Sequence, residues 1–328
     1  MQRTALRPPL MLSVGPPNWA SARTFTMIDE AGMTSRSSSR AKAVWQRLPV
    51  VVRAVVVGLL VLQIGGAVPG VLLVASLNLS PEVPWFLPAT GVWLWLFWWY
   101  VNGRGWPAAT ARMRQTDLRG KSLSGRVWFW SLLAGALGMV SVMGLVFVTS
   151  RFGNLPARAF DAPFDVSTYP WWTVLSIFLS IAGTAGVVEE SAFRGYMLSA
   201  IARRHGWIAG IAIVAVVFYI AHLSHAYATV AFLPFFLVYS ALHGLLVYLT
   251  RSILPSMIIH SVADFIVVPM QFGVIAGPGE SMFVTHGGLS IAFALAAIPA
   301  FWRLAAIARE NNLAAEDVSV AVSPGSRS

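Results

Sequence analysis

Cysteine is absent from this chain, and charged residues are scarce. Without cysteine there is no disulfide, no thiolate metal ligand, no cysteine nucleophile and no palmitoylation site. Charged residues make up only 11% of the 328 residues, whereas hydrophobic residues make up 57% and the mean hydropathy is +0.69. Soluble domains carry about a quarter charged residues, and so little charge cannot cover so much apolar surface in water. The composition therefore excludes a soluble globular protein and predicts an all-α, polytopic membrane protein.

Eight apolar segments are long enough, or nearly long enough, to cross a hydrocarbon core of about 30 Å. They cover approximately residues 54–77, 85–101, 127–148, 171–202, 207–222, 230–250, 253–268 and 289–302. We therefore expect about eight transmembrane helices within residues 51–304, which places both termini on one side. Residues 1–50, which are basic, and residues 305–328 hold no comparable apolar run and are expected to be disordered tails.

Lysine and arginine are distributed unevenly around these segments. If the N-terminus is cytoplasmic, 21 of the 23 lie on the cytoplasmic side, and only Arg151 and Arg158 lie outside. By the positive-inside rule, both termini are expected in the cytoplasm. We expect a plasma membrane of prokaryotic type, and the alternative is an internal membrane of a eukaryote. The net charge of +10 then reflects topology and lipid contact, with no nucleic-acid partner. No cleavable signal peptide is expected, because the first apolar stretch begins near residue 50; Met27 and Met33 are alternative start sites.

Ionisable residues inside the predicted spans are the most informative feature of the sequence. A charged side chain near the centre of a membrane helix costs roughly 2.5–3.5 kcal/mol, so each one needs a reason. They are Glu189, Glu190, Arg194, His222, His243, His260 and Asp264.

Glu189 and Glu190 lie inside the overlong apolar segment 171–202, which would form about 48 Å of helix. Glu190 and Arg194 are four residues apart, so they share a helix face and can form an ion pair. Glu189 points about 100° away and cannot share that partner equally well, which leaves it free for general-base chemistry. Alternatively, the glutamates mark the cytoplasmic end of a span. The apolar continuation 195–202 argues against that.

His222 is predicted to lie opposite Glu189. If the fourth and fifth segments form a hairpin at residues 205–206, both residues lie 16.5 positions from its centre. That is about 25 Å along each helix, so the two side chains have the same depth. Phe218 precedes His222 by one turn on the same face.

His260 and Asp264 are also four residues apart, on one face of the seventh segment. A carboxylate one turn away can orient an imidazole or help it hold a metal, and the alternative is a buried pair that pins two helices together. Measured from Arg251, they lie about 13 and 20 Å deep, which does not match the other two segments. His243, with Tyr239, is interpreted as interhelical packing.

Three motifs in these segments resemble the CAAX-protease and bacteriocin-processing (CPBP) family of type II CAAX prenyl endopeptidase-like intramembrane proteases. The family pattern is EExxxR, then FxxxH, then HxxxN or HxxxD. Here the motifs read Glu189-Glu190-Ser-Ala-Phe-Arg194, Phe218-Tyr-Ile-Ala-His222 and His260-Ser-Val-Ala-Asp264. The resemblance covers a protease-like core of about residues 171–268.

The resemblance implies an intramembrane endopeptidase that hydrolyses a peptide bond of a membrane-associated substrate. That substrate could be a prenylated CAAX-type protein, a peptide leader or a membrane-bound regulator. The implied catalytic residues are Glu189, Glu190, Arg194, His222, His260 and Asp264, and Phe218 is assigned to substrate binding.

The resemblance also implies roles for these residues. Glu189 would be the general base on a water molecule that His222 helps to position. His260 and Asp264 would stabilise the tetrahedral oxyanion, and Arg194 would hold its paired glutamate and the helix geometry. Within the same family, a carboxylate and two histidines would form a sufficient catalytic zinc set, so a zinc-dependent and a metal-independent mechanism are both open.

Asp264 departs from the better-studied prenyl endopeptidases of this kind, which carry Asn at this position. An Asn amide can donate a hydrogen bond to an oxyanion, whereas an ionised Asp cannot. Asp264 is therefore either protonated or serves to orient His260.

Two other functions fit the buried ionisable residues. One is a proton- or cation-coupled transporter, although we find neither an inverted repeat nor polar sites spread through the membrane. The other is a non-catalytic immunity or scaffold protein of the same fold, although the motif residues show no decay apart from Asp264.

Overall fold

The computed structural model describes residues 43–152, 164–272, 274 and 283–321. The chain divides into two units, residues 1–49 and residues 50–328. The first unit is described only from residue 43, and residues 43–47 are helical. The tail expected at residues 1–50 therefore lies outside the described residues up to residue 42.

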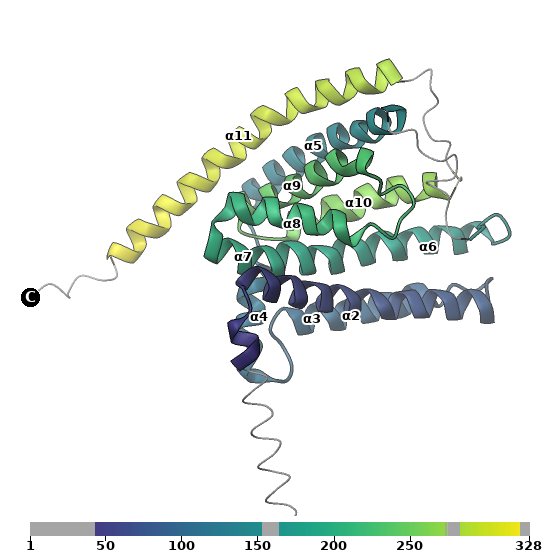
Figure 1. Ribbon diagram of the computed structural model, residues 1–328, viewed down its shortest axis with the longest axis horizontal. Coiled ribbons are helices and arrows are strands. Elements are labelled where there is room, and N and C mark those ends of the chain that lie inside the picture. Colours follow the sequence, from purple (N-terminus) through teal and green to yellow (C-terminus); the bar gives the residue numbers. More distant parts are fainter. Residues whose placement is uncertain (1–42, 153–163, 273, 275–282, 322–328) are drawn as a thin grey trace, which may run out of the picture. The chain divides into compact units, whose positions relative to one another are not determined.

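Every regular element among the described residues is helical, which confirms the all-α prediction (Figure 1). The α-helices are α2 (Val50–Leu79), α3 (Phe86–Val101), α4 (Ala111–Leu118), α5 (Gly125–Phe152), α6 (Trp171–Thr184), α7 (Leu198–His205), α8 (Trp207–Ala221), α9 (Leu233–Thr250), α10 (Leu254–Gln271) and α11 (Phe283–Ala321). A π-helical segment, η2 (Ala185–Met197), joins α6 to α7, and two short 3₁₀ turns are η1 (Ala108–Thr110) and η3 (Val230–Phe232).

Each of the eight predicted apolar segments coincides with an apolar helix. Within the described residues, five helices are long and apolar enough to cross a membrane: Val50–Leu79, Gly125–Val146, Trp171–His205, Val230–Thr250 and Thr285–Glu310. Three shorter apolar helices are Phe86–Val101, Trp207–Ala221 and Leu254–Met270. The chain is a multi-pass membrane protein, and the number of eight crossings and their orientation stay predictions.

The fourth segment differs from the regular helix that its sequence suggested. It is continuous from Trp171 to His205, but residues 185–197 are π-helical. In a π-helix each amide bonds to the carbonyl five residues back, so the turn is wider than in an α-helix. The Ser191 hydroxyl donates to the Val187 carbonyl at 2.6 Å, occupying the carbonyl that an α-helical amide would use. Such turns are rare and concentrate at functional sites, and this one carries the first motif.

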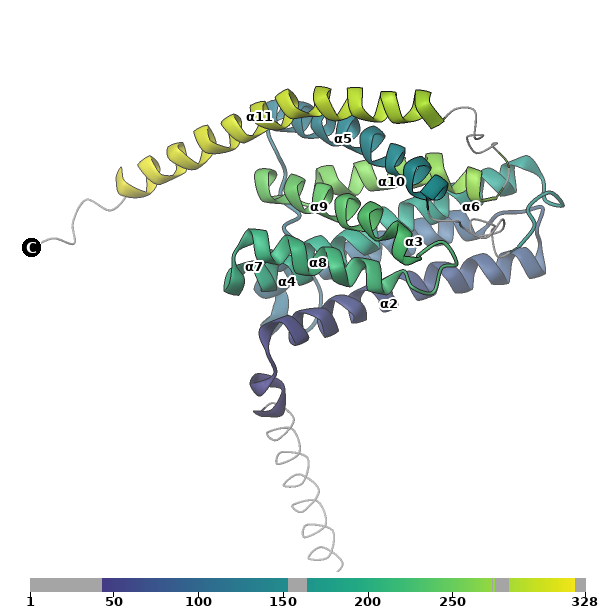
Figure 2. The same cartoon turned by 45° about the horizontal axis from the view of Figure 1, so that its top comes forward.

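The segment η2 is central in the second unit. It contacts α2, α3, α4, α8, α9 and α10. In Figure 1, α2, α3 and α4 lie on one side of the line formed by α6 and α7, and α8, α9 and α10 lie on the other. Figure 2 shows α11 running along α5, in agreement with their extensive contacts. The first motif is therefore enclosed by helices that come from both halves of the sequence.

The last helix extends further than the sequence predicted. The eighth apolar segment ends near residue 302, but α11 continues to Ala321 through residues that were expected to be disordered. The physical reason is composition, since residues 303–321 are rich in Ala, Leu, Arg and Glu and contain neither Gly nor Pro. Residues 322–328 lie outside the described residues.

Candidate active site

Glu190 is the centre of a buried polar cluster. Its Oε1 lies 3.1 Å from Arg194 Nη1, which is the ion pair that their spacing predicts. The same oxygen accepts a hydrogen bond from His260 Nδ1 at 2.8 Å, and Oε2 accepts one from the Ser256 hydroxyl. The Glu190 and Arg194 side chains are both fully buried. One carboxylate therefore joins η2 to α10 and is neutralised within its own helix.

His243 belongs to this cluster, although its sequence context suggested packing. Its Nδ1 lies 2.7 Å from Ser256 Oγ and 3.9 Å from Glu190 Oε1. Because the Ser256 hydroxyl gives its proton to Glu190, it must accept from His243 Nδ1–H. The sequence could have predicted the place of Ser256, because Ser256, His260 and Asp264 are spaced by four residues on one helix face.

Glu189 and Asp264 face the other ring nitrogen of His260. His260 Nε2 is 3.9 Å from Glu189 Oε2 and 3.7 Å from Asp264 Oδ2. The Glu189 and Asp264 side chains are 22% and 27% exposed, whereas that of His260 is 3% exposed. Glu189 Oε2 is buried and has no hydrogen-bond partner among the described residues. The two adjacent glutamates thus have different surroundings: Glu190 pairs with Arg194, whereas Glu189 Oε2 makes no hydrogen bond to the described residues.

His260 and Glu189 are in contact, although counting residues along their helices gave them different depths in the membrane. That arithmetic treated the helices as straight and parallel. The helix α10 begins at Leu254, next to a proline in its first turn, and its His260 contacts both glutamates of η2. The depth mismatch predicted for His260 is therefore not borne out, because His260 contacts both glutamates directly.

His222 and Phe218 lie beside the same cluster. The Phe218 ring is 4.6 Å from the Arg194 guanidinium and 4.4 Å from the His222 ring. His222 Nδ1 is 2.7 Å from the Phe218 carbonyl oxygen, which can only accept, so this nitrogen carries a proton. In a neutral His222, Nε2 then has a free lone pair. His222 is also close enough to His260 and Asp264 to interact electrostatically with both.

The donor set for a metal differs from the one that the motifs suggest. Among the described residues, the group that could hold a metal ion is Glu190, His243 and His260, whose donor atoms lie within 4.8 Å of one another. His222 is not part of it. In the contacts seen here, Glu190 already pairs with the buried Arg194 and accepts from His260 Nδ1. A divalent cation would have to displace these donors and lie next to a buried guanidinium, so the present arrangement does not fit a metal.

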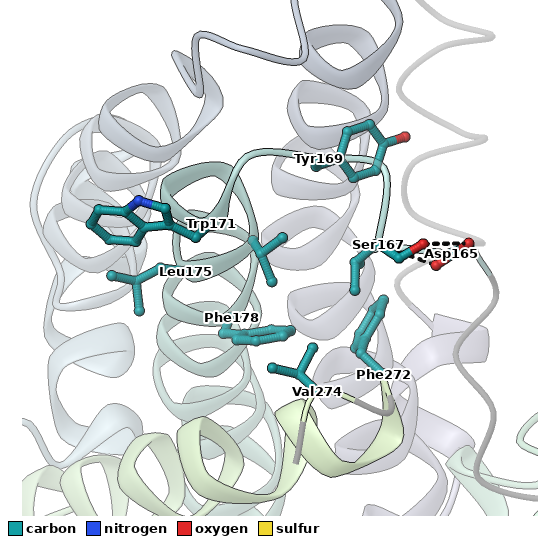
Figure 3. A pocket seen from close by; sticks show the side chains of 10 residues that line it. Asp165, Ser167, Tyr169, Trp171, Leu175, Phe178, Phe272 and Val274 are labelled. Atoms are coloured by element: carbon teal, nitrogen blue, oxygen red, sulfur yellow. Dashed lines mark hydrogen bonds between the residues drawn. The ribbon is translucent and has the colours of Figure 1, made fainter.

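A separate pocket of about 540 Å³ contains none of the motif residues (Figure 3). It lies near the start of α6 and the end of α10, where the Phe178 and Phe272 rings are 5.6 Å apart. At its polar edge, hydrogen bonds from the amide and hydroxyl of Ser167 hold the pKa of the Asp165 carboxyl below its usual range. The pocket therefore does not coincide with the buried cluster that carries the three motifs.

Residues 170–266 match the family model described as Rce1-like: Type II CAAX prenyl endopeptidase Rce1-like. No curated protein and no solved structure matches the chain. The matched segment extends from the start of α6 into α10 and contains all three motifs, as the resemblance in sequence indicated. This match over residues 170–266 supports membership of the CPBP family of CAAX-type intramembrane proteases.

Proposed function

We propose that this protein is an intramembrane endopeptidase that hydrolyses a peptide bond of a membrane-associated protein or peptide without a metal. The observation that carries this proposal is the pairing of a free carboxylate with an oriented imidazole. Glu189 Oε2 has no hydrogen-bond partner among the described residues, and it lies 3.9 Å from Nε2 of His260. The other nitrogen of His260 is fixed by Glu190.

In the first step, Glu189 acts as general base on a water molecule. The water oxygen forms a bond to the scissile carbonyl carbon while its proton passes to Glu189. The second water proton is held by the free lone pair on His222 Nε2, which turns the attacking oxygen toward the carbonyl. Collapse of the tetrahedral intermediate breaks the C–N bond, and Glu189 returns its proton to the leaving amine.

His260 stabilises the oxyanion of that intermediate. Since Nδ1 already donates to Glu190, an N–H on Nε2 makes the ring an imidazolium. Asp264 and Glu189 flank that nitrogen and favour the charged ring. A well-placed donor of this kind is worth about 2.7–4 kcal/mol of barrier lowering. Asp264 is assigned to orienting His260. Phe218, beside His222, is assigned to substrate binding.

Zinc is the alternative cofactor, held by Glu190, His243 and His260. The existing contacts of Glu190 argue against it. Activity of purified protein after treatment with a chelator separates the two mechanisms: full activity without bound metal supports the glutamate mechanism, and activity restored only by added zinc overturns it.

The substrate class follows from where the cluster lies. Buried within membrane helices, it suits substrates that are presented from the bilayer, such as prenylated C-termini or leader peptides. We place the enzyme in the plasma membrane with both termini cytoplasmic, because of its charge distribution.

N-terminal proteomics on membranes tests the function without any assumption about the substrate. We expect new protein N-termini in cells that express the wild type and their loss with Glu189→Gln. Glu82→Gln, an exposed glutamate outside the cluster, is the matched control and should keep them. Identical profiles for the wild type and a folded, expressed Glu189→Gln variant would contradict the proposal and favour a transporter or a scaffold.

A further inference from the structure

Tyr239 lies on α9 with its side chain buried. The residue is 5% exposed, and its hydroxyl oxygen has no hydrogen-bond partner among the described residues. Buried polar groups are nearly always hydrogen-bonded, because leaving one unpaired costs about 1–3 kcal/mol. A phenol kept in this state needs a reason.

The surroundings of Tyr239 place it in the catalytic cluster. Its ring stacks on Phe218 at 5.7 Å with an interplanar angle of 14°. The ring meets His260 edge to face at 5.4 Å and lies 4.8 Å from His243. Contacts on several sides fix the ring, so the position of its hydroxyl is set by packing.

The Tyr239 ring packs against the histidine that the acidic groups of the site surround. The His260 ring has Glu190 at Nδ1 and both Glu189 and Asp264 at Nε2. The phenol therefore packs against the imidazole that is proposed to stabilise the oxyanion.

The site is otherwise short of donors. An ionised Asp264 carboxylate cannot donate a hydrogen bond. His260 Nε2 alone would then face the oxyanion, whereas oxyanion holes usually combine donors. We propose that Tyr239 is a catalytic residue whose hydroxyl donates a hydrogen bond to the oxyanion, supplying the donor that Asp264 lacks. This inference rests on the proposed peptidase function.

Tyr239→Phe isolates the hydroxyl, because the ring and its packing are retained. The probe is a peptide that spans the most abundant Glu189-dependent terminus from the proteomics experiment. We expect kcat to fall about 10²-fold, as for loss of one oxyanion donor, with KM within about twofold of the wild type. Tyr248→Phe, on the same helix but packed against Trp207 at 5.2 Å, is the matched control and should leave both constants unchanged.

A double-mutant cycle with Asp264→Asn separates donation from structure. The new amide supplies a second donor, so the penalty of Tyr239→Phe should fall below about tenfold in that background. An equal penalty in both backgrounds, or a change in KM alone, would overturn the proposal in favour of a packing role.

The failure of this inference differs from the failure of the proposed function. If Tyr239→Phe keeps full kcat while Glu189→Gln is inactive, Tyr239 is not a donor and the peptidase stands. If no terminus depends on Glu189, the peptidase itself is wrong, and the role of Tyr239 falls with it.

Discussion

At the scale of single residues, Glu190 and Arg194 form an ion pair in which both side chains are fully buried. Breaking a buried pair leaves an uncompensated charge and costs about 3–5 kcal/mol. Arg194→Met removes the guanidinium, together with its contact to the Phe218 ring. We expect the free energy of unfolding, measured by SDS titration in mixed micelles, to fall by that amount.

The same substitution at an exposed pair provides the control. Arg126 and Glu310 form an ion pair at 3.2 Å, with side chains 51% and 54% exposed. Arg126→Met should change the free energy of unfolding by less than about 1 kcal/mol, because surface pairs contribute little. Equal effects of Arg126→Met and Arg194→Met would show that the buried charge of Glu190 does not depend on Arg194.

At the scale of elements, close packing of α2 on η2 positions the first motif. The buried residues of α2 are mostly small: Ala54, Gly58, Gly65, Pro69 and Ser76. Small residues let membrane helices approach closely. A Cβ added at Gly65 would lie 2.5 Å from Val188 Cγ1 and 2.9 Å from the Phe97 ring. Since Val188 directly precedes Glu189, this contact fixes the height and rotation of the proposed base.

Gly65→Ala should therefore destabilise the protein by about 1–3 kcal/mol through overpacking, and should reduce Glu189-dependent cleavage. Its neighbour Gly66 has nothing within 4 Å of an added Cβ, so Gly66→Ala is the matched control and should be neutral or slightly stabilising. Both are measured by the same SDS titration. A larger loss for Gly66→Ala than for Gly65→Ala would contradict the packing described here.

At the scale of the whole molecule, the distribution of charge predicts the orientation in the membrane. Because the chain contains no cysteine, a single introduced cysteine is the only thiol in the protein, and its labelling shows on which side of the membrane it lies. Ser122 precedes α5 and Thr168 follows it, and both are exposed. An impermeant thiol reagent should label Thr168→Cys in intact cells, and Ser122→Cys only after permeabilisation.

The labelling pattern distinguishes two alternatives to the predicted topology. The opposite pattern would invert the orientation. Labelling of both positions from outside would show that α5 does not cross the membrane.

The amino-acid sequence by itself determined the fold class, the positions of the apolar helices and the pairing of Glu190 with Arg194. Each depends on local quantities: apolar length, helix spacing and the cost of charge in a membrane. Sequence also identified the three motifs that the family model matches. The continuation of α11 to Ala321 was missed, although helix propensity in its polar end favours it.

Only the tertiary structure decided how the motifs meet. The bond from His260 to Glu190 and the inclusion of His243, Ser256 and Tyr239 depend on contacts between helices far apart in the chain. Spacing within one segment fixes a helix face, but it does not fix the rotation and height of that helix against its neighbours. Those are set by packing, and packing left Glu189 Oε2 and the Tyr239 hydroxyl unpartnered among the described residues.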